Sequence, residues 1–330
     1  MFARPILRAC LVLALCGLGL ASTPRVVGAQ IPEPDSVVLR EDVGQSEPDV
    51  AFSGDVAVCV WAGGPTAESE WSFSTDRGRH WSAPGLFPVL PFDVVGVGAT
   101  ICADRNGCFY SAALYDNESA VVCYRIGFEN GTPATTGPSF AAPFMAGDAG
   151  YPYNAPRIAC DPAGAMVYIV YTNVAPTGLT ATGSIQFVRS RDGGQTWSAP
   201  VRLGGSASNG GSIAVGLDGE VVVSWEDFAT RAAQVAISRD SGATFSTPLT
   251  AGAILDDLGA PSPGWKDQSG RFAPGYVQSN IDADFPSLAI DTSTGPHRGA
   301  IYLTWTDYRD GSLGPFAGAI DEGEPNDFFA

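Results

Sequence analysis

The sequence is poor in basic side chains. Of its 330 residues, 18 are Lys or Arg and 35 are Asp or Glu, and Lys266 is the only lysine. The formal net charge of −17 repels phosphate backbones and anionic bilayers, which disfavours nucleic acid and membrane surfaces as partners. We interpret the acidity as a solubility feature of a secreted protein rather than as a specific cation site.

Several catalytic motifs are absent. His80 and His297 are the only histidines, and neither lies in a recognisable pattern. The sequence has no Gly-x-Ser-x-Gly elbow, no zinc-binding helix, no phosphate loop and no pair of cysteines two residues apart. It therefore predicts no metal site and no cofactor, and it contains no signal for an oligomeric state.

Only the N-terminus has a long apolar run. Arg4 and Arg8 accompany an apolar stretch over residues 6–20, and a small-residue cleavage site ends at Ala29. This pattern predicts residues 1–29 to be a cleaved signal peptide, whose loss changes the net charge to about −20. The stretch is too short for a stable span, so we expect a secreted, extracellular or periplasmic protein without membrane insertion.

Cysteines are few. The mature chain keeps Cys59, Cys102, Cys108, Cys123 and Cys160. An exported protein can retain disulfides. The segment between Cys102 and Cys108 is rich in turn residues, so a bridge across this hairpin is the pairing we expect. The odd number leaves at least one thiol unpaired, and the sequence does not decide the other pairings.

One eight-residue pattern occurs three times, at residues 74–81, 190–197 and 238–245. Its skeleton is Ser-x-Asp-x-Gly-x-x-aromatic. Ser and Asp side chains bond nearby backbone amides, Gly accepts a positive φ, and an aromatic ring fills space between sheets. The pattern thus predicts a structural turn. Its residues are Ser74, Asp76, Gly78 and Trp81; Ser190, Asp192, Gly194 and Trp197; and Ser238, Asp240, Gly242 and Phe245.

A longer repeat lies behind this motif. Apolar runs end in a large side chain at Trp61, Leu114, Tyr171, Trp225 and Trp305, with spacings of 53, 57, 54 and 80 residues. A short partner run precedes each of them. With 40 Gly, 25 Pro and no helical periodicity, the chain is expected to be all-β, and a period in the fifties fits four-stranded units.

The motif and the period together resemble the Asp-box (BNR) repeat of sialidase-like β-propellers, of the secreted bacterial type. The resemblance implies an Asp-box β-propeller over residues 30–315. Five repeats begin and the last is incomplete, whereas the family usually closes six blades, so we expect a piece of a longer protein. Residues 316–330 are interpreted as an acidic linker or the start of a further domain.

The resemblance also implies which face binds ligands. The connections from second to third strands share one face with the inter-blade connections, opposite the Asp-box turns. The ends of the second strands place Asp116, Asn173, Asp227 and Asp307 on that face, and Arg309 follows in the last connection.

Arg157 departs from the repeat, because the other units carry Asp49, Thr100, Ser212 and Ser287 there. Tyr151 and Tyr153 precede it. A guanidinium fork beside aromatic rings suits a carboxylate, but pairing with an Asp of a neighbouring blade is the favoured interpretation, because acidic residues are abundant.

The spacing of 80 residues between Trp225 and Trp305 indicates an insertion within residues 251–280, which contains Trp265 and Arg271. A loop that binds a ligand and a loop without a function are equal alternatives for this insertion. Asp282 and Asp284 follow it. Capping is the favoured role of these two residues, and calcium binding is the alternative.

The leading functional hypothesis is a module that binds a carbohydrate or protein ligand, with Tyr151, Tyr153, Trp265, Arg271 and Arg309 as contacts. The alternative is an exo-α-sialidase or related glycoside hydrolase, with Arg157 on the substrate carboxylate and Asp227 or Asp307 as acid/base. A third is a passive structural module. One fold hosts many functions, so the resemblance does not decide among them.

Overall fold

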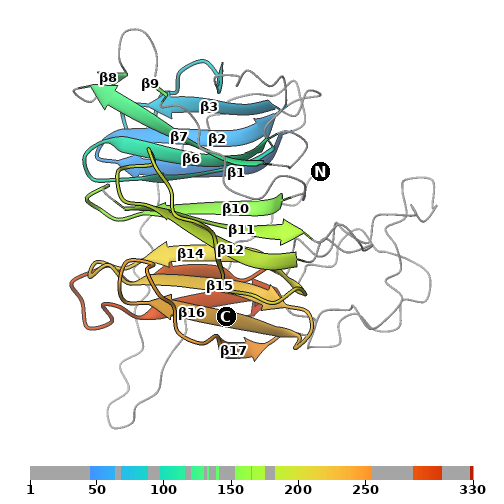
Figure 1. Ribbon diagram of the computed structural model, residues 1–330. Helices are drawn as coiled ribbons and strands as arrows, with labels where there is room; N and C mark the ends of the chain where they lie inside the picture. Colours follow the sequence, from blue (N-terminus) through green and yellow to red (C-terminus); the bar gives the residue numbers. More distant parts are fainter. Residues whose placement is uncertain are drawn as a thin grey trace, which may run out of the picture.

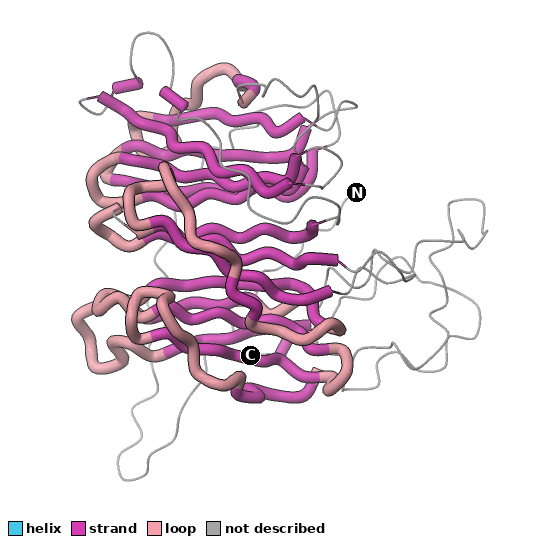
Figure 2. Tube along the Cα trace, viewed as in Figure 1, coloured by secondary structure: helices cyan, strands magenta, loops and turns pink. Residues whose placement is uncertain are grey.

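The computed structural model describes residues 45–63, 68–87, 97–115, 120–129, 132–133, 139–140, 153–164, 166–174, 183–254, 285–306 and 328–329. Within these ranges the chain consists of strands and turns (Figure 2). This confirms the all-β class. In the same part of the chain, no helix has the length and apolarity to cross a membrane.

The strands form successive antiparallel sheets. The first sheet contains β1 (Gln45–Ser53), β2 (Val56–Gly63), β3 (Glu68–Ser74) and β4 (Gly85–Leu86). The second contains β5 (Val97–Ala103), β6 (Cys108–Tyr115), β7 (Ala120–Glu129), β8 (Thr132–Pro133) and β9 (Ser139–Phe140). The third contains β10 (Tyr153–Cys160), β11 (Val167–Val174), β12 (Gly183–Ser190) and β13 (Val201–Arg202).

The fourth sheet contains β14 (Ser208–Val215), β15 (Val221–Asp227), β16 (Ala232–Ser238) and β17 (Leu249–Ala253). A single pairing of Gly183 with Ser208 connects it to the third sheet. The fifth contains β18 (Ser287–Ile290), β19 (Ile301–Thr306) and β20 (Phe328–Phe329). The last of these strands lies in residues 316–330, interpreted above as an acidic linker or the start of a further domain, and it pairs with Trp305 and Thr306.

The sheets lie one after another in chain order (Figure 1). The second strands β6, β11 and β15 are buried along most of their length, because neighbouring sheets cover their faces, whereas β19 of the fifth sheet is exposed at Ile301 and Tyr302. In β15 the run Val221-Val222-Val223 is fully buried, and β-branched side chains suit such a position. This explains why the second strands read as continuous apolar runs rather than as alternating ones.

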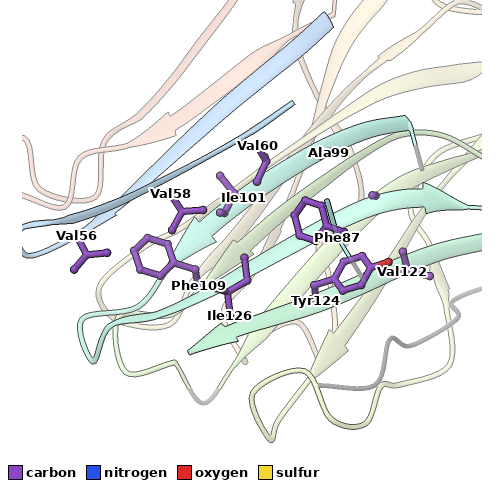
Figure 3. Packing of buried hydrophobic residues seen from close by; sticks show 11 residues of the cluster. Val56, Val58, Val60, Phe87, Ala99, Ile101, Phe109, Val122, Tyr124 and Ile126 are labelled. Atoms are coloured by element: carbon purple, nitrogen blue, oxygen red, sulfur yellow. The ribbon is translucent and has the colours of Figure 1, made fainter. Parts of the chain in front are cut away.

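Between the first two sheets, Val58 and Val60 of β2 face Phe109 of β6 and Tyr124 and Ile126 of β7 (Figure 3). Strand alternation sends every second side chain of a sheet to the same neighbour. Equivalent cores lie between the second and third sheets and between the third and fourth. Each core belongs to two sheets, so a sheet is stabilised mainly by its neighbours.

The three motif turns share one hydrogen-bonding arrangement. In the first copy the Ser74 hydroxyl donates to Asp76 Oδ1 (2.8 Å) and accepts from the Gly78 amide (2.8 Å), while the His80 amide donates to Asp76 Oδ1 (2.9 Å). The other two copies repeat these bonds around Ser190 and Ser238. The residues therefore form turns, as their chemistry predicts.

These hydrogen bonds lower the pKa of the motif aspartates. For Asp192 the largest cause is the Thr196 hydroxyl, followed by the Thr196 amide, and the pKa falls to about 2. A lowered pKa means that the bonds stabilise the folded chain fully above about pH 4 and that this stabilisation is lost as the pH falls through about 2.

We expect unfolding measured between pH 4 and pH 2 to depend less on pH in Asp192→Asn than in the parent, because the amide does not take up a proton. Thr196→Val keeps the carboxylate but removes its strongest donor and so raises its pKa in the folded state, which should make the acid loss smaller and complete at a higher pH. Chemical denaturation at several pH values measures both. An unchanged pH profile in both variants would show that this turn is not linked to stability.

Candidate functional site

The sheets have two distinct ends. We call the end where β1, β5, β10 and β14 begin and β2, β6, β11 and β15 finish the candidate face. The register places Tyr153 opposite Asn173 and Ser208 opposite Asp227 there. The motif turns follow β3, β12 and β16 at the other end, where Ser190 pairs with Val167. Asn173 and Asp227 thus lie at the end opposite the turns, as the sequence predicts.

Hydrogen bonds also link neighbouring sheets. Asp49 Oδ2 of the first sheet accepts from the Thr100 hydroxyl (2.8 Å) and the Ile101 amide (2.9 Å) of the second. At the turn end, Arg189 Nη1 of the third sheet donates to the Ser241 carbonyl of the fourth (2.9 Å). Polar contacts therefore join these sheets in addition to their shared apolar cores.

Asp227 is half-buried at the end of β15. Its Oδ1 accepts from the amides of Ala229 and Thr230, each at 3.0 Å. These bonds close the turn into β16 and fix the direction of the carboxylate. The side chain has a structural role in the turn, and because both of these bonds use Oδ1, Oδ2 has no hydrogen-bond donor among the described residues.

A β-bulge precedes Arg157 on β10, where the register shifts between Asn154 and Arg157. The same shift occurs in β1 before Asp49, in β5 before Thr100 and in β14 before Ser212. Arg157, which departs from the sequence repeat, thus occupies the first paired position after a bulge that recurs in four sheets. Bulges re-aim side chains and occur often beside binding sites.

The Arg157 guanidinium is exposed. Nη1 donates to the Pro156 carbonyl at 3.3 Å, and in the described ranges no carboxylate forms an ion pair with it. The interpretation of Arg157 as the partner of a neighbouring acidic residue therefore finds no support in this part of the chain. Exposed and without an acidic partner among the described residues, the group can take a carboxylate from a ligand.

Sequence reasoning missed a buried polar group between the third and fourth sheets. Thr172 Oγ1 of β11 donates to Asn209 Oδ1 of β14 (2.7 Å), which also accepts from the Gly210 amide (2.7 Å). Glu226 is the cross-strand partner of Asn209, and it is completely buried. The signal in the sequence was Glu226, a charged residue that follows the apolar run Val221–Trp225 and precedes Asp227.

Arg231 was also missed. It lies in the turn between β15 and β16 on the candidate face, is exposed, and has a φ of 50°. Its carbonyl accepts from the Ile254 amide at 2.9 Å, which ties the turn to the end of β17. The signal was its position four residues after Asp227, in a connection already assigned to this face.

Several predicted residues lie outside the described ranges. They are Asp116, Tyr151, Trp265, Arg271, Asp282, Asp284, Asp307 and Arg309, together with most of the insertion. For Tyr153 the structure describes only the backbone, in β10. Within the described residues no group of three or more His, Cys, Asp or Glu side chains could hold a metal ion.

The expected Cys102–Cys108 disulfide is wrong in this structure, in which all five cysteines are free thiols. The register places Cys102 opposite Tyr110, so Cys108 is not its cross-strand neighbour. Cys108 Sγ instead accepts from Arg125 Nε at 3.1 Å. Cys59 lies in the first sheet, where burial, and secondarily Asp49, raises the pKa of its thiol to about 11.

No family model matches the chain, and no curated protein matches it. Solved structures similar to it include a Trypanosoma rangeli sialidase in complex with sialic acid, with 15% identity and a TM-score of 0.49. That comparison covers 80% of this chain and 44% of the sialidase. A Penicillium chrysogenum α-L-arabinanase complexed with arabinobiose has 13% identity, coverage of 83% and 78%, and a TM-score of 0.48.

The Hadza microbial sialidase Hz136 is also similar, with 13% identity and a TM-score of 0.44. That comparison covers 64% of this chain and 47% of the sialidase. A further comparison, with an exo-β-1,3-galactanase from Phanerochaete chrysosporium, covers 62% of this chain and 49% of the galactanase. The chain thus spans about half the length of these proteins.

Proposed function

We propose that residues 30–315 form an exported, sialidase-like β-propeller with Asp-box turns, which binds a carbohydrate or protein ligand on the candidate face. The observation that carries the proposal is the position of the polar groups relative to the motif turns. The turns occupy one end of the sheets and Asp227 and Arg231 the other, while Arg157 lies midway along β10, opposite Val170. The three polar groups thus lie apart from the motif turns, which supports a role in recognition.

The favoured ligand carries a carboxylate. A guanidinium donates two parallel hydrogen bonds to a carboxylate, and the one hydrogen bond of the exposed Arg157 side chain within the described residues is a long one to the Pro156 carbonyl. Arg231 adds an exposed guanidinium at the candidate face. An acidic sugar fits this pair better than a neutral glycan, and the net charge of −17 makes a polyanion an unfavourable ligand.

Binding to an array of sialylated and neutral glycans tests this proposal. We expect the parent to retain acidic glycans and Arg157→Ala to bind them about 30–100-fold more weakly, since a charged bidentate pair is worth roughly 2–3 kcal/mol. Arg239→Ala is the matched control, because Arg239 is exposed in a motif turn at the opposite end. Equal loss in both variants, or binding by neither acidic nor neutral glycans, would contradict the proposal.

Exo-sialidase activity is the second candidate, favoured by the fixed carboxylate of Asp227. Two amides orient it toward the candidate face, as an acid/base group requires. Hydrolysis of a fluorogenic sialoside by the parent, and its loss in Asp227→Asn with binding retained, is the expected result for an enzyme. Binding without turnover supports a binding module, and neither binding nor turnover supports a passive structural module.

A further inference from the structure

Four cysteine thiols gather in the core between the second and third sheets. Cys123 of β7 is buried in this core, and Cys102 of β5, Cys108 of β6 and Cys160 of β10 pack against it. Cys102 and Cys160 are half-buried, whereas Cys123 is 2% exposed. The thiols come from four strands of two sheets, so any bond between the sheets would cross-link separate units of the fold.

Strand alternation makes Cys102 and Cys160 face each other. Ile101 and Ala103 of β5 pack into the core with the first sheet, so Cys102 between them points the opposite way, toward the third sheet. Ile158 of β10 belongs to the core with the second sheet, and Cys160, two residues on, shares its side.

Burial, and after it the Cys160 thiol, raises the pKa of Cys102 well above its usual range, and the two side chains come from the contacting strands β5 and β10. The other two thiols have partners within their own sheet, since Cys123 Sγ contacts the carbonyl of Tyr124 at 3.9 Å and Cys108 Sγ accepts from Arg125 Nε at 3.1 Å. Two thiols that face each other from strands of adjacent sheets can bond covalently after a small approach. Of the pairs that would join the two sheets, this geometry selects Cys102 with Cys160.

We propose that Cys102 and Cys160 form a disulfide that cross-links the second and third sheets when the protein meets an oxidising thiol–disulfide partner. A disulfide reagent such as oxidised glutathione supplies the oxidising equivalents. One cysteine thiolate attacks the reagent, which forms a mixed disulfide and releases a first glutathione thiol. The second cysteine then attacks the protein sulfur and releases the other. The two cysteines lose two protons and two electrons, which the reagent gains.

The bond would close a loop of roughly 60 residues, which restricts the unfolded chain strongly. We expect oxidation to raise the melting temperature by about 5–15 °C, because a loop of this size stabilises a domain of more than 150 residues by that amount. Cys102 and Cys160 lie near the ends of β5 and β10, away from the candidate face, so the proposed disulfide is independent of what that face binds.

Tryptic mapping of the whole chain tests the pairing without any substitution. Cleavage after arginine leaves Cys102 alone in the peptide 80–105 and Cys160 alone in 158–189, while Cys108 and Cys123 share 106–125. After equilibration with oxidised glutathione and alkylation of free thiols, we expect 80–105 linked to 158–189 in the monomer. Full alkylation of these peptides, a link through 106–125, or a link found only in dimers would overturn the proposal.

Melting curves with and without dithiothreitol supply the second readout. Cys102→Ser and Cys160→Ser should lose the redox-dependent shift, whereas Cys123→Ser should keep it. Each variant is compared with itself in the two redox states, so a general loss of stability does not affect the result. A shift that survives in Cys102→Ser, or that disappears in Cys123→Ser alone, would assign the bond to another pair.

Discussion

Gly242→Ala is expected to lower the free energy of unfolding by about 3 kcal/mol. Gly242 has a φ of +73°, which costs an alanine roughly 1 kcal/mol or more. A Cβ there would lie 2.6 Å from Phe187 Cζ and 3.4 Å from Tyr168, inside the core between the third and fourth sheets. Overpacking adds about 1–3 kcal/mol, because Phe187 is already in contact with Phe245.

Gly78→Ala is the matched control for this prediction. It occupies the same place in the motif and has a φ of +85°, but the nearest atom to its Cβ would be Trp81 Cζ2 at an ordinary 3.5 Å. We expect a loss of only about 1 kcal/mol from the backbone. Urea denaturation of both variants measures the difference. Equal losses would show that the core around Phe187 relaxes to accept a methyl group.

Trp61→Phe should cost about 2 kcal/mol more than Trp225→Phe, although the two residues are equivalent in the repeat. Both indoles are buried, at 2% and 1% exposure. Trp61 Nε1 donates to Glu70 Oε2 at 2.7 Å, and the register places these residues opposite each other. The substitution removes a buried hydrogen bond to a carboxyl group, which is worth roughly 1.5–3 kcal/mol.

Trp225 provides the control for the lost packing. Its Nε1 has no hydrogen-bond partner within the described ranges, and the residue opposite, Gln234, donates to Thr230 and Thr250 instead. Trp225→Phe therefore loses packing alone, for about 1 kcal/mol. Thermal and urea unfolding of the two variants give the comparison. A Trp61→Phe variant as stable as Trp225→Phe would mean that the Glu70 contact contributes nothing.

The features predicted well from the sequence are local. The motif bonds span at most four residues, so Ser74, Asp76 and Gly78 carry enough information to specify their turn. Apolar runs such as Val221–Trp225 indicate a strand covered on both faces without knowledge of its partners. The order of strands along each sheet follows from the same repeat.

Features that depend on the register or on neighbouring sheets could not be predicted. The bulge before Arg157 is a property of the pairing between β10 and β11, and no single residue type marks it. The Cys102–Cys108 prediction failed for a related reason, because the pairing of β5 with β6 puts Tyr110 opposite Cys102. The Asn209 contact with Thr172 joins separate sheets, so spacing along the chain does not reveal it.

The chain order of the strands also bears on how the protein acquires its structure. The main strands of each sheet pair mostly with their immediate neighbours in sequence, through hairpins such as β1–β2 and β15–β16. Contacts that are short in sequence cost little loop-closure entropy and form early. A sheet can therefore assemble as soon as its own segment of roughly fifty residues has left the ribosome or a translocation channel. Later sheets then add to a surface that already exists, and nascent-chain lengths that end between sheets should be more resistant to protease than lengths that end within one.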